Sequence, residues 1–225
     1  MKRTLPLPSL EPIVLVLTLI LSGCVTPAPM DYTAFIQAKP ASLLVLPPLS
    51  DSPDIKATPG VWAQATKPLS EAGYYVFPIT LVDETFRQNG LNMAAEIHAV
   101  SPEKLHAFFG ADAAVYLRVT QYGARYSVIS SDTTVAVEGY IVDLRSGKRL
   151  WEGKARASSS EEQQNQGGLI GLLAVAIVKQ IVSATTDASF RYAGIANERL
   201  LGIPRVNGLL AGPRSPLYGQ PPTAR

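Results

Sequence analysis

The chain contains a single cysteine, Cys24, and a thiol can act as a nucleophile, a metal ligand, half of a disulfide or a site of acylation. It follows an apolar run from Pro12 to Leu21, which Lys2 and Arg3 precede. A basic start, a short apolar run and small residues before a cut are the parts of a secretory signal, and a bilayer-spanning helix would need about 20 residues. An exported chain with one cysteine cannot form an internal disulfide, so this thiol is either free or chemically occupied.

The four residues Leu21-Ser22-Gly23-Cys24 resemble the lipobox that prolipoprotein signal peptidase reads. The resemblance implies cleavage between Gly23 and Cys24 and lipid attachment to the Cys24 sulfur, where two or three acyl chains hold a protein on a membrane. The alternative is an ordinary signal peptide with a bystander cysteine. The next residue is Val25, not the aspartate that commonly retains lipoproteins at the inner membrane. We therefore expect the periplasmic face of the outer membrane.

No other group of residues forms a catalytic or metal-binding motif. His98 and His106 are eight residues apart, and neither has the cysteine or histidine partner that a zinc site requires. The glycines of residues 167–171 lack the Gly-Lys-Ser/Thr ending of a phosphate-binding loop. Asp51 and Asp54 lie in a Ser/Pro-rich loop, where such residues usually bond their own backbone. The sequence therefore predicts a protein that is not an enzyme and has no cofactor or metal.

The charge balance also excludes a class of partner. The precursor has 225 residues, of which 20 are Lys or Arg and 18 are Asp or Glu, for a net charge of +2. A nucleic-acid-binding protein needs a concentrated basic face to neutralise phosphates, and the sequence has no such run. We expect no nucleic-acid partner.

The first half of the exported chain alternates short apolar runs with helical patterns, which is typical of parallel strands joined by crossover helices. Pro68 is expected to kink or divide one of these helices. Ser101 and Pro102 have the types that cap and begin another helix. The predicted elements are a strand at 42–46, a helix at 60–72, a strand at 74–79, a helix at 80–88 and a helix from 101 to Gly110.

After Gly110 the apolar residues recur with a period of two, which indicates half-buried strands. These strands cover 115–119 and 135–141, and 124–129 could form a further strand. Residues 143–153 read as a hairpin with its turn at Arg145 to Lys148. The predicted fold class is therefore α/β: one domain with a mixed sheet, parallel in its first half and an antiparallel meander in its second, packed by helices.

A polar loop at 158–168 leads into ten apolar residues, Leu169 to Val178. The run is too short to span a bilayer, and it favours a helix packed on the sheet. The alternative is a helix that also contacts a partner or another subunit. The residues that would form this candidate partner surface are Leu169, Ile170, Leu172, Leu173 and Val175.

Four segments follow from these patterns. Residues 1–23 form the lipoprotein signal peptide, and residues 24–40 form a lipidated tether that could reach roughly 50 Å. Residues 41–202 form the α/β periplasmic domain. Residues 203–225 are rich in Pro and Gly, and we expect them to be disordered or loosely bound.

Five segments of the chain carry a family resemblance: residues 43–48, 71–78, 82–86, 110–113 and 150–153. They resemble a family of Gram-negative lipoproteins of unknown function that includes a neisserial vaccine antigen. Members of that family look like the amino-terminal domain of the Tol-Pal protein TolB and the periplasmic domain of the curli export lipoprotein. The resemblance implies an α/β domain and a partner-binding role, with envelope partners such as a curli-channel-like lipoprotein, and it supplies no catalytic residues.

Together these observations predict an outer-membrane-anchored periplasmic lipoprotein. Its function would be to bind other proteins, without catalysis, in an envelope assembly or transport system. The alternative is a self-assembling subunit that forms a homo-oligomer or associates with a pore. The sequence lacks the strands of about ten alternating residues that a membrane barrel would draw from each subunit.

Overall fold

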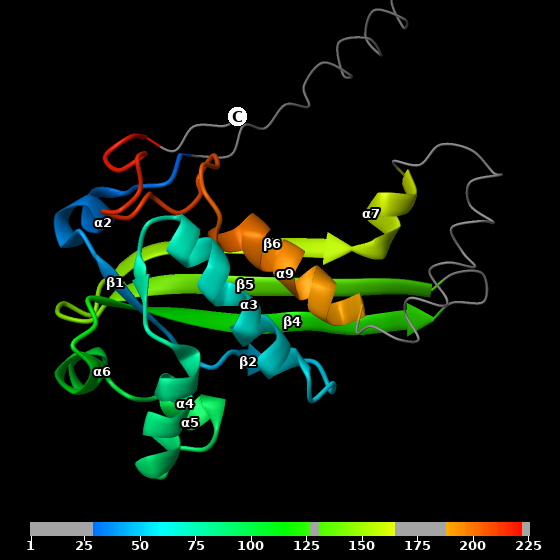
Figure 1. The fold of residues 1–225 in the computed structure, drawn as a ribbon, viewed down its shortest axis with the longest axis horizontal. Coiled ribbons are helices and arrows are strands. Elements are labelled where there is room, and N and C mark those ends of the chain that lie inside the picture. Colours follow the sequence, from blue (N-terminus) through cyan, green and yellow to red (C-terminus); the bar gives the residue numbers. More distant parts are fainter. Residues whose placement is uncertain (1–28, 127–130, 165–187, 222–225) are drawn as a thin grey trace, which may run out of the picture. The chain divides into compact units, whose positions relative to one another are not determined.

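The computed structural model describes the backbone of residues 29–126, 131–164 and 188–221 (Figure 1). The chain divides into two units, Met1–Met30 and Asp31–Arg225. All contacts below lie within the second unit.

A mixed sheet forms the centre of this unit, with strand order β3-β1-β4-β5-β6 and β2 pairing beside β4. The β1 strand is parallel to both β3 and β4, whereas β4, β5 and β6 form an antiparallel meander. This arrangement confirms the predicted fold class. The strands are β1 Ser42–Val45, β2 Leu49–Ser50, β3 Tyr75–Val76, β4 Ala113–Tyr126, β5 Ser131–Asp143 and β6 Arg149–Ser158.

Two helices cover one face of the meander and pack against each other, α3 and α9 (Figure 1). The side chain of Asn197 on α9 donates to the Val61 carbonyl of α3 at 2.9 Å, fully buried between them. The helices in the described residues are α2 Thr33–Ala38, α3 Ala57–Glu71, α4 Ile79–Gln88, α5 Ala94–His98, α6 Pro102–Phe109, α7 Ser159–Gln164 and α9 Ala188–Leu201.

The α9 helix approaches the sheet closely because glycines lie beneath it. A Cβ added at Gly139 would meet the Leu117 side chain at 2.7 Å, and one added at Gly153 would meet Trp151 at 2.6 Å. Leu200 fills the space above both glycines. Since successive strand residues point to opposite faces, Tyr116 and Tyr140 project from the other face of the sheet.

Several local predictions are confirmed. The Ser101 hydroxyl accepts the Lys104 N–H at the start of α6, and Gly110 ends that helix with φ 67°. The hairpin turn joins Asp143 to Arg149 as predicted. Pro68 does not divide its helix: α3 runs continuously from Ala57 to Glu71, with Pro68 in its last turn.

The prediction that residues 203–225 form a disordered tail is wrong for residues 203–221, which are folded onto the domain. Leu209 is 1% exposed, and the Gly212 N–H donates to the Ala72 carbonyl at 2.8 Å. The Tyr74 hydroxyl donates to the Leu210 carbonyl at 2.6 Å. A Cβ at Gly212 would lie 2.6 Å from the Gly73 carbonyl oxygen. The glycine in this segment thus permits close backbone approach, where composition alone had suggested disorder.

The prediction that residues 24–40 form a tether is also wrong for the second half of that range. Residues Thr33–Ala38 form α2, in which Phe35 is 4% exposed. The Tyr32 hydroxyl donates to the carbonyl of Gly208 at 2.5 Å. The folded domain therefore begins about ten residues earlier than the sequence indicated.

Three smaller expectations differ from the structure. The strand predicted at 74–79 is only Tyr75–Val76, because α4 already begins at Ile79. Residues 124–126 continue β4 and do not begin another strand. Part of the predicted polar loop at 158–168 forms α7.

The strands of the meander run between two ends of the domain (Figure 1). We call the end with α2, the start of β1 and the β5–β6 turn the entry end, because the described domain begins there. We call the end where β4 reaches Tyr126 and β6 reaches Ser158 the far end. The 14 residues of β4 connect the two. At about 3.3 Å per residue, they lie roughly 45 Å apart.

Candidate functional site

The residues predicted to carry function lie outside the described part of the chain. These are Gly23 and Cys24 at the cleavage site, and the candidate partner surface of Leu169, Ile170, Leu172, Leu173 and Val175. Lipidation and partner binding by these residues remain predictions. The structure describes the residues that flank the second group, which are Gln164 at the end of α7 and Ala188 at the start of α9.

A clamp of hydrogen bonds at the far end holds one of those flanks. The Asp132 carboxylate accepts the hydroxyls of Ser158 at 2.7 Å and Ser159 at 2.8 Å, and the Ser160 N–H at 3.0 Å. The Thr134 hydroxyl also donates to it, at 3.1 Å. Partial burial alone would raise the pKa of Asp132, but these donors stabilise the carboxylate and lower the pKa below its ordinary value. The clamp fixes the start of α7 to the start of β5.

Arg199 ties α9 to the same region. Its guanidinium donates to the Arg156 carbonyl of β6 at 2.6 Å and forms an ion pair with Glu161 of α7 at 2.6 Å. Hydrogen bonding by Arg199 lowers the pKa of Glu161. Asp132 and Arg199 thereby fix α7 relative to β6 and α9.

A hollow of about 670 Å³ lies between the outer edge of β6, the end of α9 and residues 202–208. The Trp151 indole N–H forms part of its wall and donates to the Asn207 carbonyl at 3.3 Å. Lys154, Arg199 and Arg205 line it, and of its described lining residues Glu198 is the one carboxylate. Glu198 is already paired with Lys67 at 3.0 Å. The lining suits a polar or anionic group. The sequence did not predict this hollow, because residues 203–208 were assigned to a disordered tail.

A ring nitrogen of each histidine lies within hydrogen-bond distance of a backbone carbonyl. The His98 Nε2 atom lies 2.9 Å from the Pro47 carbonyl oxygen, and its ring packs edge-on against Tyr116. Burial lowers the pKa of His98, which favours its neutral form. The His106 Nδ1 atom lies 2.8 Å from the Ala111 carbonyl oxygen and closes the end of α6.

The face of the sheet away from α3 and α9 carries an aromatic ladder. Tyr116 of β4 and Tyr140 of β5 stack with ring centroids 4.8 Å apart, and the Arg149 guanidinium lies 4.4 Å from the Tyr140 ring centre. Burial, with a smaller contribution from Tyr140, raises the pKa of Tyr116 to about 12. The Tyr116 phenol is therefore protonated at neutral pH and does not supply a base, and the stacked pair stabilises the sheet.

The carboxylates of Asp51 and Asp54 are hydrogen-bonded to protein groups. Asp51 accepts two hydrogen bonds from the Arg118 guanidinium, at 2.8 and 2.6 Å, which lower the pKa of Asp51. Asp54 accepts the Lys56 N–H at 2.9 Å as a turn residue. Over the described residues, no group of three or more His, Cys, Asp or Glu side chains could hold a metal ion.

Within the same residues, no helix is long and apolar enough to cross a membrane.

Comparisons with known proteins place the chain among lipoproteins. Residues 30–214 match the family described as "Putative lipoprotein GNA1162-like". The "Putative lipoprotein NMB1124/NMB1162" of Neisseria meningitidis is 49% identical over 209 residues, which cover 91% of this chain and 97% of that protein.

Two solved structures illustrate the range of structural likeness. The crystal structure of lipoprotein GNA1162 from Neisseria meningitidis is 51% identical with a TM-score of 0.50, and the match covers 64% of this chain and 99% of that one. The PelC dodecamer from Paraburkholderia phytofirmans is 10% identical with a TM-score of 0.39, over 80% of this chain and 96% of that one. The family match spans most of the described domain, including the folded segment at 203–214. The chain therefore belongs to the GNA1162-like family of lipoproteins, as the segment resemblance predicted.

Proposed function

We propose that this protein is a lipoprotein of the outer membrane, lipidated on Cys24 and facing the periplasm, whose folded domain binds other envelope proteins without catalysis. The binding residues in this proposal are those predicted from the sequence, Leu169, Ile170, Leu172, Leu173 and Val175. The protein would act in a system of envelope assembly or transport. Membership of a lipoprotein family supports the anchor.

The arrangement of the domain's two ends is the observation that carries the proposal. The described domain begins at the entry end, where Tyr32 contacts Gly208. The chain leaves the described domain after α7, which the Asp132 clamp holds at the far end. A sheet roughly 45 Å long thus separates the side that follows the anchor from the flank of the proposed binding segment. Such a spacer would hold a partner away from the lipid surface.

The clamp also suits a binding role because it fixes a flank before any partner is present. Four donors hold Asp132, and Arg199 holds both β6 and α7. Fixing chain conformation upon binding costs free energy, so a flank that is already fixed lowers that cost. The chemistry found in the described residues, a polar hollow and an aromatic ladder, fits binding better than acid-base catalysis.

Photo-crosslinking in intact cells tests the proposal. A photoreactive amino acid at Leu173 should capture the same envelope protein in repeated experiments. The matched control is the same amino acid at Glu138, an exposed position on the open face of the sheet. Capture of one set of proteins from both positions, or no capture at Leu173 while the protein accumulates normally, contradicts the proposed binding segment.

The same experiment separates the alternative function. Adducts between two copies of this chain from Leu173, with no other protein captured, would support a self-assembling or pore-associated subunit in place of a module that binds other proteins. Light scattering on the Leu173→Asp variant checks that result, because a charge in an apolar contact between copies should shift the assembly toward monomer.

A further inference from the structure

The length of chain between the proposed lipid and the folded domain is short. Eight residue steps separate Cys24 from Tyr32, and each step spans at most about 3.6 Å, so the two lie within about 30 Å of each other. The expected 16-residue tether would have allowed roughly 50 Å. Given the proposed lipidation on Cys24, the entry end of the domain must remain near the headgroups of the bilayer.

The contacts of Tyr32 determine which residues are nearest to the lipid. Its hydroxyl donates to Gly208, and the Gly208 N–H donates to the Arg205 carbonyl at 3.0 Å, so the turn at 205–208 lies beside the first residues of the domain. The α2 helix then runs from Thr33 to Ala38 and ends at Lys39 in the left-handed conformation, φ 47°. Both segments lie at the entry end (Figure 1).

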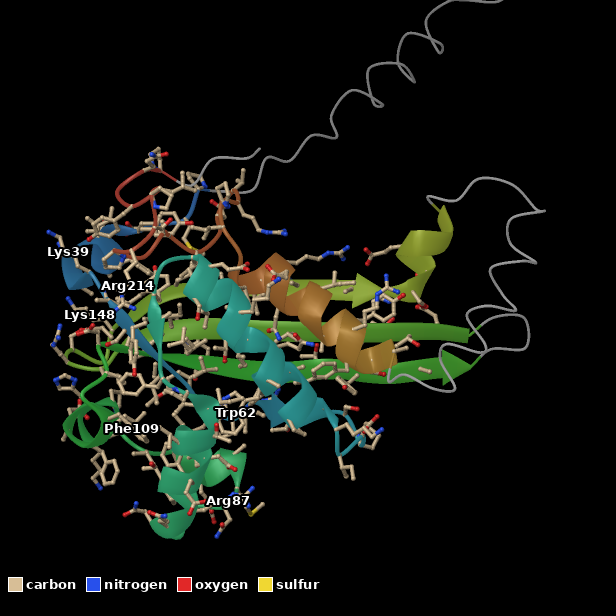
Figure 2. The ribbon with its side chains drawn as sticks, in the orientation of Figure 1. Lys39, Trp62, Arg87, Phe109, Lys148 and Arg214 are labelled. Atoms are coloured by element: carbon tan, nitrogen blue, oxygen red, sulfur yellow. The ribbon has the colours of Figure 1, made fainter. Side chains whose placement is uncertain are left out.

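The entry end exposes apolar side chains beside cations. Ile36 is 59% exposed, Val206 58% and Tyr218 47%. Figure 2 shows Lys39 and Arg214 at the same end of the ribbon, with Lys148 close by in that view. Exposed aliphatic and tyrosyl side chains mixed with Lys and Arg are the composition of surfaces that lie in the interface of a membrane.

The carboxylates at this end do not neutralise those cations. Asp112 is bonded to Arg145 and to Ser42, and Glu152 pairs with Arg149 at 2.7 Å. The Asp143 side chain, 6% exposed, accepts from Ser146. The exception is Asp31, whose carboxylate accepts the Thr33 N–H at 2.8 Å.

Four cations at this end have no carboxylate within ion-pair distance among the described residues: Lys39, Lys148, Arg205 and Arg214. The Arg214 guanidinium lies 5.7 Å from the centre of the Tyr75 ring, and the Arg214 N–H donates to the Gly73 carbonyl at 3.1 Å. An excess of positive charge therefore remains next to the exposed apolar side chains.

We propose that a surface of six residues at the entry end rests on the anionic phospholipid headgroups of the membrane that holds the anchor. These residues are Ile36, Lys39, Arg205, Val206, Arg214 and Tyr218. The inference rests on the proposed lipidation of Cys24. It assigns the domain a fixed orientation, with the entry end on the lipid and the far end directed into the periplasm.

Fluorescence quenching on vesicles tests this orientation with the full processed lipoprotein. Because the sequence has one cysteine, which the lipid would occupy, an introduced cysteine is the only thiol available for a fluorophore. Val206→Cys reports on the entry end. Ile55→Cys is the matched control, since Ile55 is 90% exposed and lies next to the start of α3, toward the far end. The vesicles contain phosphatidylglycerol and a lipid with a spin label near its headgroup.

We expect the label at residue 206 to lose most of its fluorescence on these vesicles and the label at residue 55 to lose none. Vesicles of phosphatidylcholine alone should quench residue 206 less. Lys39→Glu or Arg205→Glu in the labelled chain should lower the ratio of quenched to unquenched molecules at least about fivefold. The reason is that each cation near an anionic surface raises the equilibrium constant for contact with that surface by about that factor. Lys56→Glu, an equal charge change at the start of α3, should leave the ratio unchanged.

Equal quenching at residues 206 and 55, or quenching at 206 that does not depend on anionic lipid, overturns the inference. Protection of the residue 206 label without quenching by lipid also overturns it, and indicates a protein on this surface. A failure of the anchor gives a different result: the chain without an introduced cysteine would then take up the fluorophore on Cys24.

Discussion

The Tyr32 hydroxyl donates a hydrogen bond to the carbonyl of Gly208 across 176 residues of sequence. This contact joins the first residues of the domain to a segment that follows its last helix. It places both at the end of the sheet from which the proposed anchor extends.

Removing the Tyr32 hydroxyl should weaken the contact between the first residues of the domain and the segment at Gly208. Tyr32→Phe should lower the free energy of unfolding by about 1 kcal/mol, because the Gly208 carbonyl loses its partner while the ring remains in place. Urea unfolding of the exported domain measures the change. Tyr218→Phe is the control, since Tyr218 is 47% exposed and should change stability little. An unchanged midpoint for Tyr32→Phe would mean that the contact does not hold the entry end.

The folded state of residues 203–221 is tested by a core truncation. Leu209→Ala should cost about 2 to 5 kcal/mol, because Leu209 is 1% exposed and its removal leaves a cavity. Val206→Ala, in the same segment but 58% exposed, should cost less than about 0.5 kcal/mol. If both variants changed the stability equally little in thermal unfolding, the result would instead support the disordered tail that the composition suggested.

The sequence predicted which segments form strands better than it predicted where the elements begin and end. Particular residues show the physical reasons. Alternation at Val115, Leu117 and Val119 identified β4 because these residues are buried on one face of the strand, whereas Arg118 and Thr120 on the other face are exposed or half-buried. Short helices such as Ala94–His98 were missed because five residues carry no measurable helical period.

The prediction was wrong where a high content of Pro and Gly was interpreted as disorder. The Pro/Gly-rich segment after Ile203 packs because Gly212 lets its backbone reach Ala72, a long-range contact that no local pattern reveals. The hollow beside Trp151 was missed for the same reason, because its wall includes that segment. The Asp132 clamp joins residues 26 to 28 positions apart, and only the register of β5 with β6 brings them together.

Loss of the Asp132 carboxylate should weaken the far end. Asp132→Asn should destabilise the domain by about 1 to 3 kcal/mol at pH 7, because Ser158, which is 3% exposed, and Ser159 lose a charged acceptor. Hydrogen exchange should rise first in α7. Asp83→Asn, which breaks only the exposed pair with Arg87, should cost less than about 0.5 kcal/mol.

The same carboxylate gives a pH dependence of known sign. Its hydrogen bonds hold the pKa of Asp132 below that of the unfolded chain, which is about 3.9. The stabilisation is therefore fully present above about pH 5 and is lost as the pH falls through the folded-state pKa. The stability difference between wild type and Asp132→Asn should shrink between pH 5 and pH 3 in urea unfolding. A difference that stays constant over that range would contradict the assigned role.

Membrane sorting should depend on the residue after the lipidated cysteine. Val25→Asp places an aspartate where it commonly retains lipoproteins at the inner membrane, so the protein should move from the outer-membrane to the inner-membrane fraction of a density gradient. Val25→Asn, similar in size and uncharged, is the comparison. An inner-membrane location for the unaltered chain would show that the expected address is wrong.

Intact-mass measurement of the protein extracted from native membranes tests the anchor most directly. We predict a mature chain that begins at Cys24 and carries a diacylglyceryl thioether on its sulfur. The Cys24→Ser variant should carry no lipid and should leave the membrane fraction. A chain that begins elsewhere, or begins at Cys24 with an unmodified thiol, would contradict the account and remove the basis for the orientation proposed here.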